Sequence, residues 1–143
     1  EWLSSFTTLN CKPHLKSYTE HLCQMMESKI FAFIAHPDIF GCTNLEWNAD
    51  LIECSREILL TAEETQTPLE INGNGLRKKH INSSDGPRPP YPWRPFWELA
   101  AEFNIKVVCN SDCHYPNEVV AGIAENLELA NNIGLELADL SYL

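Results

Sequence analysis

The sequence contains no long hydrophobic run. Its longest uninterrupted apolar stretch is Ile30 to Ala35, whereas a helix needs about 20 apolar residues to cross a membrane. The chain also opens without the basic and then apolar segment that is typical of a secretory signal. These two absences predict a cytoplasmic protein without a membrane partner.

Basic residues are scarce as well. Ten Lys and Arg stand against 20 Asp and Glu, which gives a net charge of −10. Binding to duplex nucleic acid depends on many Lys and Arg contacts to phosphates. The composition therefore argues against extended nucleic acid as a partner.

Half of the basic residues nevertheless lie between Ile71 and Trp97, where Asp85 is the only acid. They are Arg77, Lys78, Lys79, Arg88 and Arg94. A small positive region in an acidic protein suits a compact anion, such as a small phosphorylated substrate. A solvated charged loop has the same composition, and both interpretations stay open at this point.

The six cysteines are irregularly spaced, and a chain of this size does not need them as cross-links. A chain of 143 residues can bury roughly 68 to 70% of its unfolded surface, which is enough for one domain with a core. We therefore expect free thiols. Because the first residue is Glu1 rather than Met, we also expect the sequence to be a piece of a longer polypeptide.

Hydrophobic periodicity predicts helices that alternate with short strands. The predicted helices are Leu15 to Ser28, Glu46 to Glu64, Phe96 to Phe103, and a last one from near Asn117 to Gly134 whose buried stripe begins with Val120 and Ile123. The predicted strands are Ile30 to Ala35, fully buried, then Thr67 to Asn72, Ile105 to Cys109, and Leu135 to Leu137. This order implies an α/β fold with a parallel sheet. The predicted strands are too few to close a barrel, which needs about eight. If the sheet belongs to a barrel, its other strands should come from outside this sequence.

Polar residues follow three of these strands, and the carboxyl ends of parallel strands share one rim. His36 and Asp38 follow the first strand, and Pro37 between them predicts an extended backbone at His36. In the second strand, alternation puts Glu70 and Asn72 on the same face.

The third strand leads into Asn-Ser-Asp-Cys-His. In an extended segment Asp112 and His114 project together while Cys113 points elsewhere. A carboxylate beside an imidazole supplies two of the ligands that zinc, iron or manganese needs. Taken alone, His36 is more typical of a loop histidine than of a metal ligand, and Asp112 is equally typical of a helix cap. Three polar clusters on one rim together predict a metal site.

Four motifs, in this order, resemble the polymerase and histidinol phosphatase (PHP) superfamily, in particular its histidinol-phosphate phosphatase branch. They are His36-Pro37-Asp38, Leu69 to Asn72 followed by Gly75-Leu76-Arg77-Lys78, Tyr91-Pro92, and Ser111 to His114. The resemblance covers roughly residues 15 to 135. The family's opening His-x-His motif, its next Asp/His motif and a bridging glutamate would all lie before Glu1, and Cys113 stands where a small residue is more usual.

The resemblance implies a distorted, TIM-like (β/α)7 barrel, of which residues 1–143 form the C-terminal portion without the N-terminal strands. It also implies two or three divalent ions at the carboxyl rim. The residues that it assigns are the metal ligands His36, Asp112 and His114, the catalytic residues Asp112 and His114, and the substrate-binding residues Arg77, Lys78, Glu70 and Asn72. The alternative is that Glu70 is a carboxylate that faces a helix or the solvent.

The implied activity of the complete protein is metal-dependent hydrolysis of a phosphate monoester, namely histidinol phosphate in histidine biosynthesis. The isolated piece is expected to bind metal weakly, to be nearly inert and to self-associate through exposed sheet edges. Two alternatives stay open. One is a PHP-type phosphodiesterase, either an exonuclease or a nucleotide phosphoesterase, and the other is a truncated module without catalytic activity.

Overall fold

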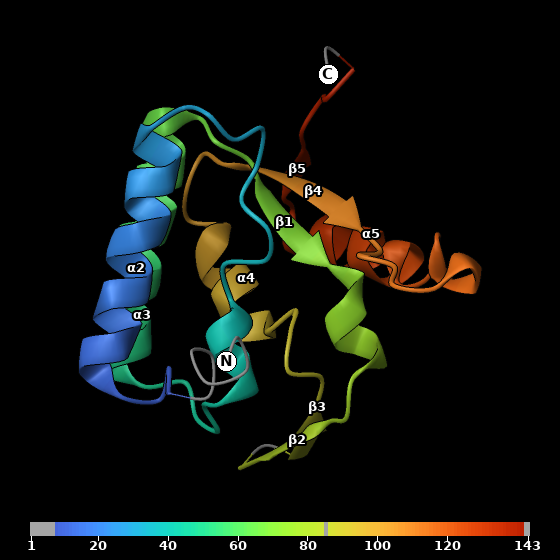
Figure 1. Cartoon of the computed structure of the whole chain (residues 1–143), viewed down its shortest axis with the longest axis horizontal. Helices are drawn as coiled ribbons and strands as arrows, with labels where there is room; N and C mark the ends of the chain where they lie inside the picture. Colours follow the sequence, from blue (N-terminus) through green and yellow to red (C-terminus); the bar gives the residue numbers. More distant parts are fainter. Residues whose placement is uncertain (1–7, 85, 142–143) are drawn as a thin grey trace.

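The sheet at the centre of the molecule has three parallel strands. The computed structural model describes residues 8–84 and 86–141, and within them β1 (Leu69–Asn72), β4 (Lys106–Asn110) and β5 (Glu136–Leu137) pair in the order β1-β4-β5 (Figure 1). The register places Asn72 beside Asn110 at the carboxyl ends. The predicted α/β fold with a parallel sheet is confirmed. The described strands do not show a closed barrel.

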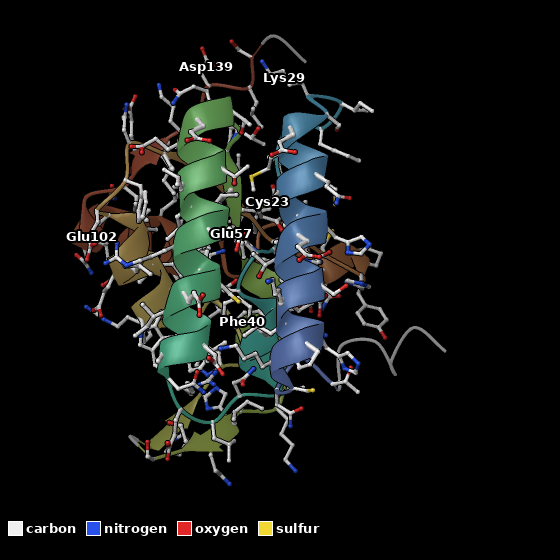
Figure 2. All side chains as sticks on the ribbon, turned by 90° about the vertical axis from the view of Figure 1, so that its left-hand side faces the viewer. Cys23, Lys29, Phe40, Glu57, Glu102 and Asp139 are labelled. Carbon is white, nitrogen blue, oxygen red and sulfur yellow. The ribbon has the colours of Figure 1, made fainter. Side chains whose placement is uncertain are left out.

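Two long helices, α2 (Lys12–Glu27) and α3 (Ala49–Thr65), lie side by side and cover one flank of the molecule (Figures 1 and 2). Asn48 begins α3 by accepting a hydrogen bond from the backbone N–H of Leu51 at 3.1 Å. Cys23 of α2 faces α3, where the hydroxyl of Thr61 donates to its sulfur at 3.3 Å. Both helices agree with the sequence prediction, with ends shifted by a few residues. Over the described part of the chain, no helix has the length and apolar character needed to traverse a bilayer.

Aromatic side chains fill the core beneath these helices. Phe40, which is labelled in Figure 2, belongs to the 3₁₀ turn η1 (Ile39–Cys42) and is fully buried. It meets Phe96 of α4 (Arg94–Ala100) edge to face, with ring centroids 6.0 Å apart. Phe96 in turn meets Trp97 at 5.0 Å. These contacts join η1 to α4, so the segment after His36 is anchored by its apolar residues.

The prediction of a buried strand from Ile30 to Ala35 is wrong. Only Ile34 pairs with the sheet, through a parallel bridge to Leu69, and Ile30 and Phe31 are 79% and 45% exposed. The run lies along the outer edge of β1, and no described strand covers its other side. A short apolar run does not reveal how much of it the fold buries.

Two other segments differ in detail from the prediction. The stretch from Asn82 to Pro95, which lies between the predicted helices and strands, includes most of an antiparallel hairpin of β2 (Ile81–Ser83) and β3 (Gly86–Arg88). The last helix does not start near Asn117.

The chain there forms a 3₁₀ turn, η3 (Pro116–Glu118), and α5 (Ile123–Ile133) begins only after Gly122. Gly122 has a φ of +79°, which interrupts the helical path. Val120, predicted to be buried, is therefore 75% exposed, because it lies in the turn before the helix. The last predicted strand is confirmed as β5, which pairs with the start of β4.

Candidate functional site

Amide and carboxylate side chains meet at the carboxyl ends of β1 and β4. Glu70 is only 3% exposed, and its two oxygens accept hydrogen bonds from Asn72 Nδ2 at 2.9 Å and Asn110 Nδ2 at 3.1 Å. Burial raises the pKa of Glu70, although the two amides favour its ionised form. The expectation that Glu70 and Asn72 share one face of the strand is confirmed by their mutual hydrogen bond.

The same amide of Asn72 also reaches the loop after β4. Its Nδ2 donates to Asp112 Oδ2 at 3.1 Å, and Asn74 Nδ2 donates to that oxygen at 3.2 Å. Asn72 Oδ1 is itself held by the backbone N–H of Asn74 at 2.9 Å. One amide group therefore links the carboxylates of Glu70 and Asp112, which come from neighbouring strand ends.

His114 lies beside Asp112 with a defined ring orientation. Its Nδ1 is 2.9 Å from the backbone carbonyl of Asp112 and 3.9 Å from Asp112 Oδ1. A carbonyl oxygen can only accept, so this contact requires a proton on Nδ1, and a neutral ring then presents its lone pair on Nε2. The side chain is 62% exposed. Structural histidine ligands in metal sites are commonly oriented by such a second hydrogen bond.

The predicted proximity of Asp112 and His114 is thus present, but the predicted cause is wrong. The segment is not extended, because Asp112 has a φ of +47° in the left-handed region. The carboxylate and the imidazole approach each other through a turn in the backbone rather than through strand alternation.

His36 occupies the rim next to β1, again with a backbone conformation that differs from the prediction. Its φ is +67°, so Pro37 does not hold it extended. The imidazole lies 6.2 Å from the ring of Tyr91, measured between centroids. The nearby ring of His36 slightly lowers the pKa of Glu70 and of Asp38, against the larger effect of burial.

Tyr91 is a rim residue that belongs to a quoted motif but to which the sequence assigned no role. It is buried against Gly75, where any Cβ would overlap its backbone, and its ring neighbours that of His36. Burial raises the pKa of Tyr91, and Cys42 and Asp112 add to that shift. Its only sequence signal was the Tyr-Pro pair. No local pattern indicates that the chain, 20 positions after Ile71, returns to this rim.

Arg77 directs its guanidinium at the backbone. Nη1 donates to the carbonyls of Gly73 and Ala121, both at 3.0 Å. Nη2 donates to those of Ser111 at 2.8 Å and Asp112 at 3.2 Å. Both terminal nitrogens are therefore engaged in this conformation, which leaves no pair of N–H groups for a two-pronged grip on a phosphate.

Lys78 differs from Arg77 in being exposed. Burial raises the pKa of the Cys42 thiol and the ammonium of Lys78 lowers it, so Lys78 lies on the η1 side of the rim. No hydrogen bond or ion pair occupies its ammonium among the described residues. Of the two predicted phosphate-binding side chains, Lys78 is the one whose charged group is accessible.

The donor set fits a metal ion only in part. Zinc bonds to nitrogen and oxygen are about 2.0 to 2.2 Å long, so two ligands of one ion lie up to about 4 Å apart. His114 Nδ1 lies 3.9 Å from Asp112 Oδ1, but this nitrogen also contacts the Asp112 carbonyl, so the nitrogen left for an ion is Nε2. Across residues 8–84 and 86–141, however, no group of three or more His, Cys, Asp or Glu is arranged to hold one.

A scan against models of known protein families finds no match for this chain, and a search of curated proteins finds no significant similarity. The resemblance to the PHP superfamily therefore stays a prediction from the motifs.

Proposed function

We propose that this chain forms part of a metal-dependent phosphate-monoester hydrolase of the PHP type. The observation that carries the proposal is the amide bridge of Asn72, which joins the carboxylates of Glu70 and Asp112 at the carboxyl edge of a parallel sheet. Sites in parallel α/β proteins gather at this edge. Asp112 and His114 lie side by side there with His36 on the same rim, as the motif resemblance implies.

In this proposal Asp112 and His114 are two of the ligands, and the remaining ligands come from elsewhere in a complete, seven-stranded TIM-like barrel. Divalent ions in such a site lower the pKa of bound water and neutralise phosphoryl oxygens. Glu70, with both oxygens held by amides, fixes the orientation of Asn72 and through it that of Asp112.

The proposed substrate is a small phosphate monoester, and the motif resemblance favours histidinol phosphate. Of the two basic side chains predicted to bind substrate, Lys78 is the one whose ammonium is free to meet the phosphate. The net charge of −10 supports a compact substrate over a nucleic-acid strand, because extended phosphodiesters require many basic contacts. Hydrolysis of a phosphodiester in preference to the monoester would favour the exonuclease alternative instead.

Asp112→Asn tests this proposal in the complete polypeptide that contains this chain. The substitution keeps the shape of the side chain but removes a charged ligand. We expect phosphate release from histidinol phosphate, measured with added Mn²⁺ or Zn²⁺, to fall by about 100-fold or more in kcat/KM.

Asp139→Asn is the matched control, since that carboxylate lies in the exposed C-terminal segment and its loss should leave turnover unchanged (Figure 2). Equal activity of Asp112→Asn and the wild type would exclude Asp112 as a ligand. Absence of turnover in every variant would favour the non-catalytic module.

A further inference from the structure

We infer that Arg77 is a positioning residue that holds Asp112 and His114 in place and selects the tautomer of His114, in contrast to the phosphate-binding role that its motif suggests. The functional meaning of this inference rests on the proposed function. The geometry that it predicts does not, and can be measured without any activity.

The guanidinium of Arg77 joins three segments that are far apart in the sequence. Its four backbone acceptors belong to the start of the 3₁₀ turn η2 (Gly73–Arg77), to residues 111–112 after β4, and to Ala121 before α5. Figure 1 shows these segments meeting beyond the ends of β1 and β4. A planar fork of N–H donors suits such a set of carbonyls better than the single ammonium of lysine.

Two contacts carry the influence of Arg77 to His114. The carbonyl of Asp112 accepts from Arg77 Nη2 and also from His114 Nδ1. Glu118 Oε2 lies 3.5 Å from Arg77 Nη2 and accepts the backbone N–H of His114 at 3.4 Å. The ring of His114 is therefore connected to the guanidinium through one shared acceptor, the Asp112 carbonyl. The backbone N–H of His114 is connected to it through another, Glu118 Oε2.

This arrangement explains how Asp112 keeps its unusual backbone. A residue other than glycine with a positive φ persists when the surrounding contacts determine its conformation. The carbonyls of Ser111 and Asp112, which belong to the two peptide groups that flank the Cα of Asp112, accept from Arg77. The carboxylate of Asp112 accepts from Asn72 and Asn74. With the carbonyl of Asp112 so placed, His114 keeps its proton on Nδ1 and presents Nε2.

The test is Arg77→Lys, with the tautomer of His114 read from its ring ¹⁵N chemical shifts at a pH where the imidazole is neutral. In the wild-type chain we expect the Nδ1–H form to predominate. In Arg77→Lys the ratio of the two tautomers should shift by about fivefold toward the Nε2–H form, as expected for the loss of one hydrogen bond.

Arg88→Lys is a matched control, because Arg88 also binds four backbone carbonyls. These belong to Gly41, Asn44, Pro89 and Pro90, none of them near His114 in the sequence or in the hydrogen-bond network. It should destabilise the fold to a similar extent and leave the tautomer of His114 unchanged. An unchanged tautomer in Arg77→Lys, or an equal shift in both variants, would overturn the inference.

If Arg77→Lys fails to fold, Glu118→Gln tests the same connection while the four carbonyl contacts remain. It should shift the His114 tautomer in the same direction, and no shift would again count against the inference. In the complete enzyme, Arg77→Lys should lower kcat with little change in KM, whereas a phosphate-binding arginine would raise KM. If the wild type and all variants are inactive, the proposed function is wrong. The ¹⁵N shifts still decide the role of Arg77 in that case.

Discussion

Replacement of Asp38 by alanine is expected to lower the free energy of unfolding by about 3 kcal/mol. Asp38 is fully buried, and its Oδ2 accepts from the backbone N–H of Trp93 at 2.6 Å and from Trp97 Nε1 at 2.9 Å. These bonds fasten η1 to the start of α4. Alanine leaves both N–H groups buried without an acceptor, and each costs roughly 1 to 3 kcal/mol, offset in part by removal of the buried charge.

Asp38→Asn is the matched variant, because it keeps an acceptor oxygen but cannot ionise. Burial raises the pKa of Asp38 from 3.8 to about 6, against the lowering effect of the two hydrogen bonds. The folded state therefore holds this proton more tightly than the unfolded state. The stabilisation from Asp38 is complete below pH 3.8 and is lost as the pH rises through about 6.

Denaturant unfolding at about pH 4 and pH 8, with EDTA present, measures this difference. The wild type should lose about 2.5 kcal/mol relative to Asp38→Asn between the two conditions. If the difference in free energy of unfolding between wild type and Asp38→Asn does not change with pH, Asp38 has the same pKa in the folded and unfolded states. Wild-type stability in Asp38→Ala would show that the Trp93 and Trp97 contacts do not matter.

Gly75→Ala should be at least as damaging, with an expected loss of about 4 kcal/mol or failure to fold. A Cβ at this position would overlap the backbone carbonyl and the ring of Tyr91. Neither group can move aside freely, because the residues around Tyr91 are buried in the core. The substitution would push the Tyr91 segment away from η2 and open the polar rim.

Gly134→Ala provides the contrast for Gly75. Gly134 ends α5 with a φ of +85°, but nothing lies within 4 Å of a Cβ built on it. Its replacement should therefore cost only about 1 kcal/mol of backbone strain. Comparable melting temperatures for the two variants would contradict the close approach of Tyr91 to η2.

The periodic elements were predictable from sequence because their own residues determine them. The apolar stripes of α2 and α3, and the alternation in β1 that pairs Glu70 with Asn72, survive in the fold with small shifts at the ends. The run at Ile30 did not form a strand, since burial of a strand depends on neighbours that lie elsewhere in the chain.

The rim was predictable in composition but not in geometry. The sequence places His36, Asp112 and His114 after strands, yet the positive φ of His36 and Asp112 has no local signal in non-glycine residues. The Asn72 bridge and the carbonyl contacts of Arg77 join residues about 40 positions apart. Such contacts arise only when the two strand ends have come together.

A titration of the ¹⁵N-labelled chain with Mn²⁺ addresses directly whether Asp112 and His114 bind a cation. Paramagnetic broadening detects even weak occupancy, which suits a site for which two ligands are proposed. We expect the signals of Asp112, His114 and Glu118 to broaden at the lowest Mn²⁺ concentrations, and this early broadening to disappear in Asp112→Asn. Broadening that begins at the exposed histidines His14, His21 or His80, or that spreads evenly over the acidic surface, would contradict a metal site at this rim.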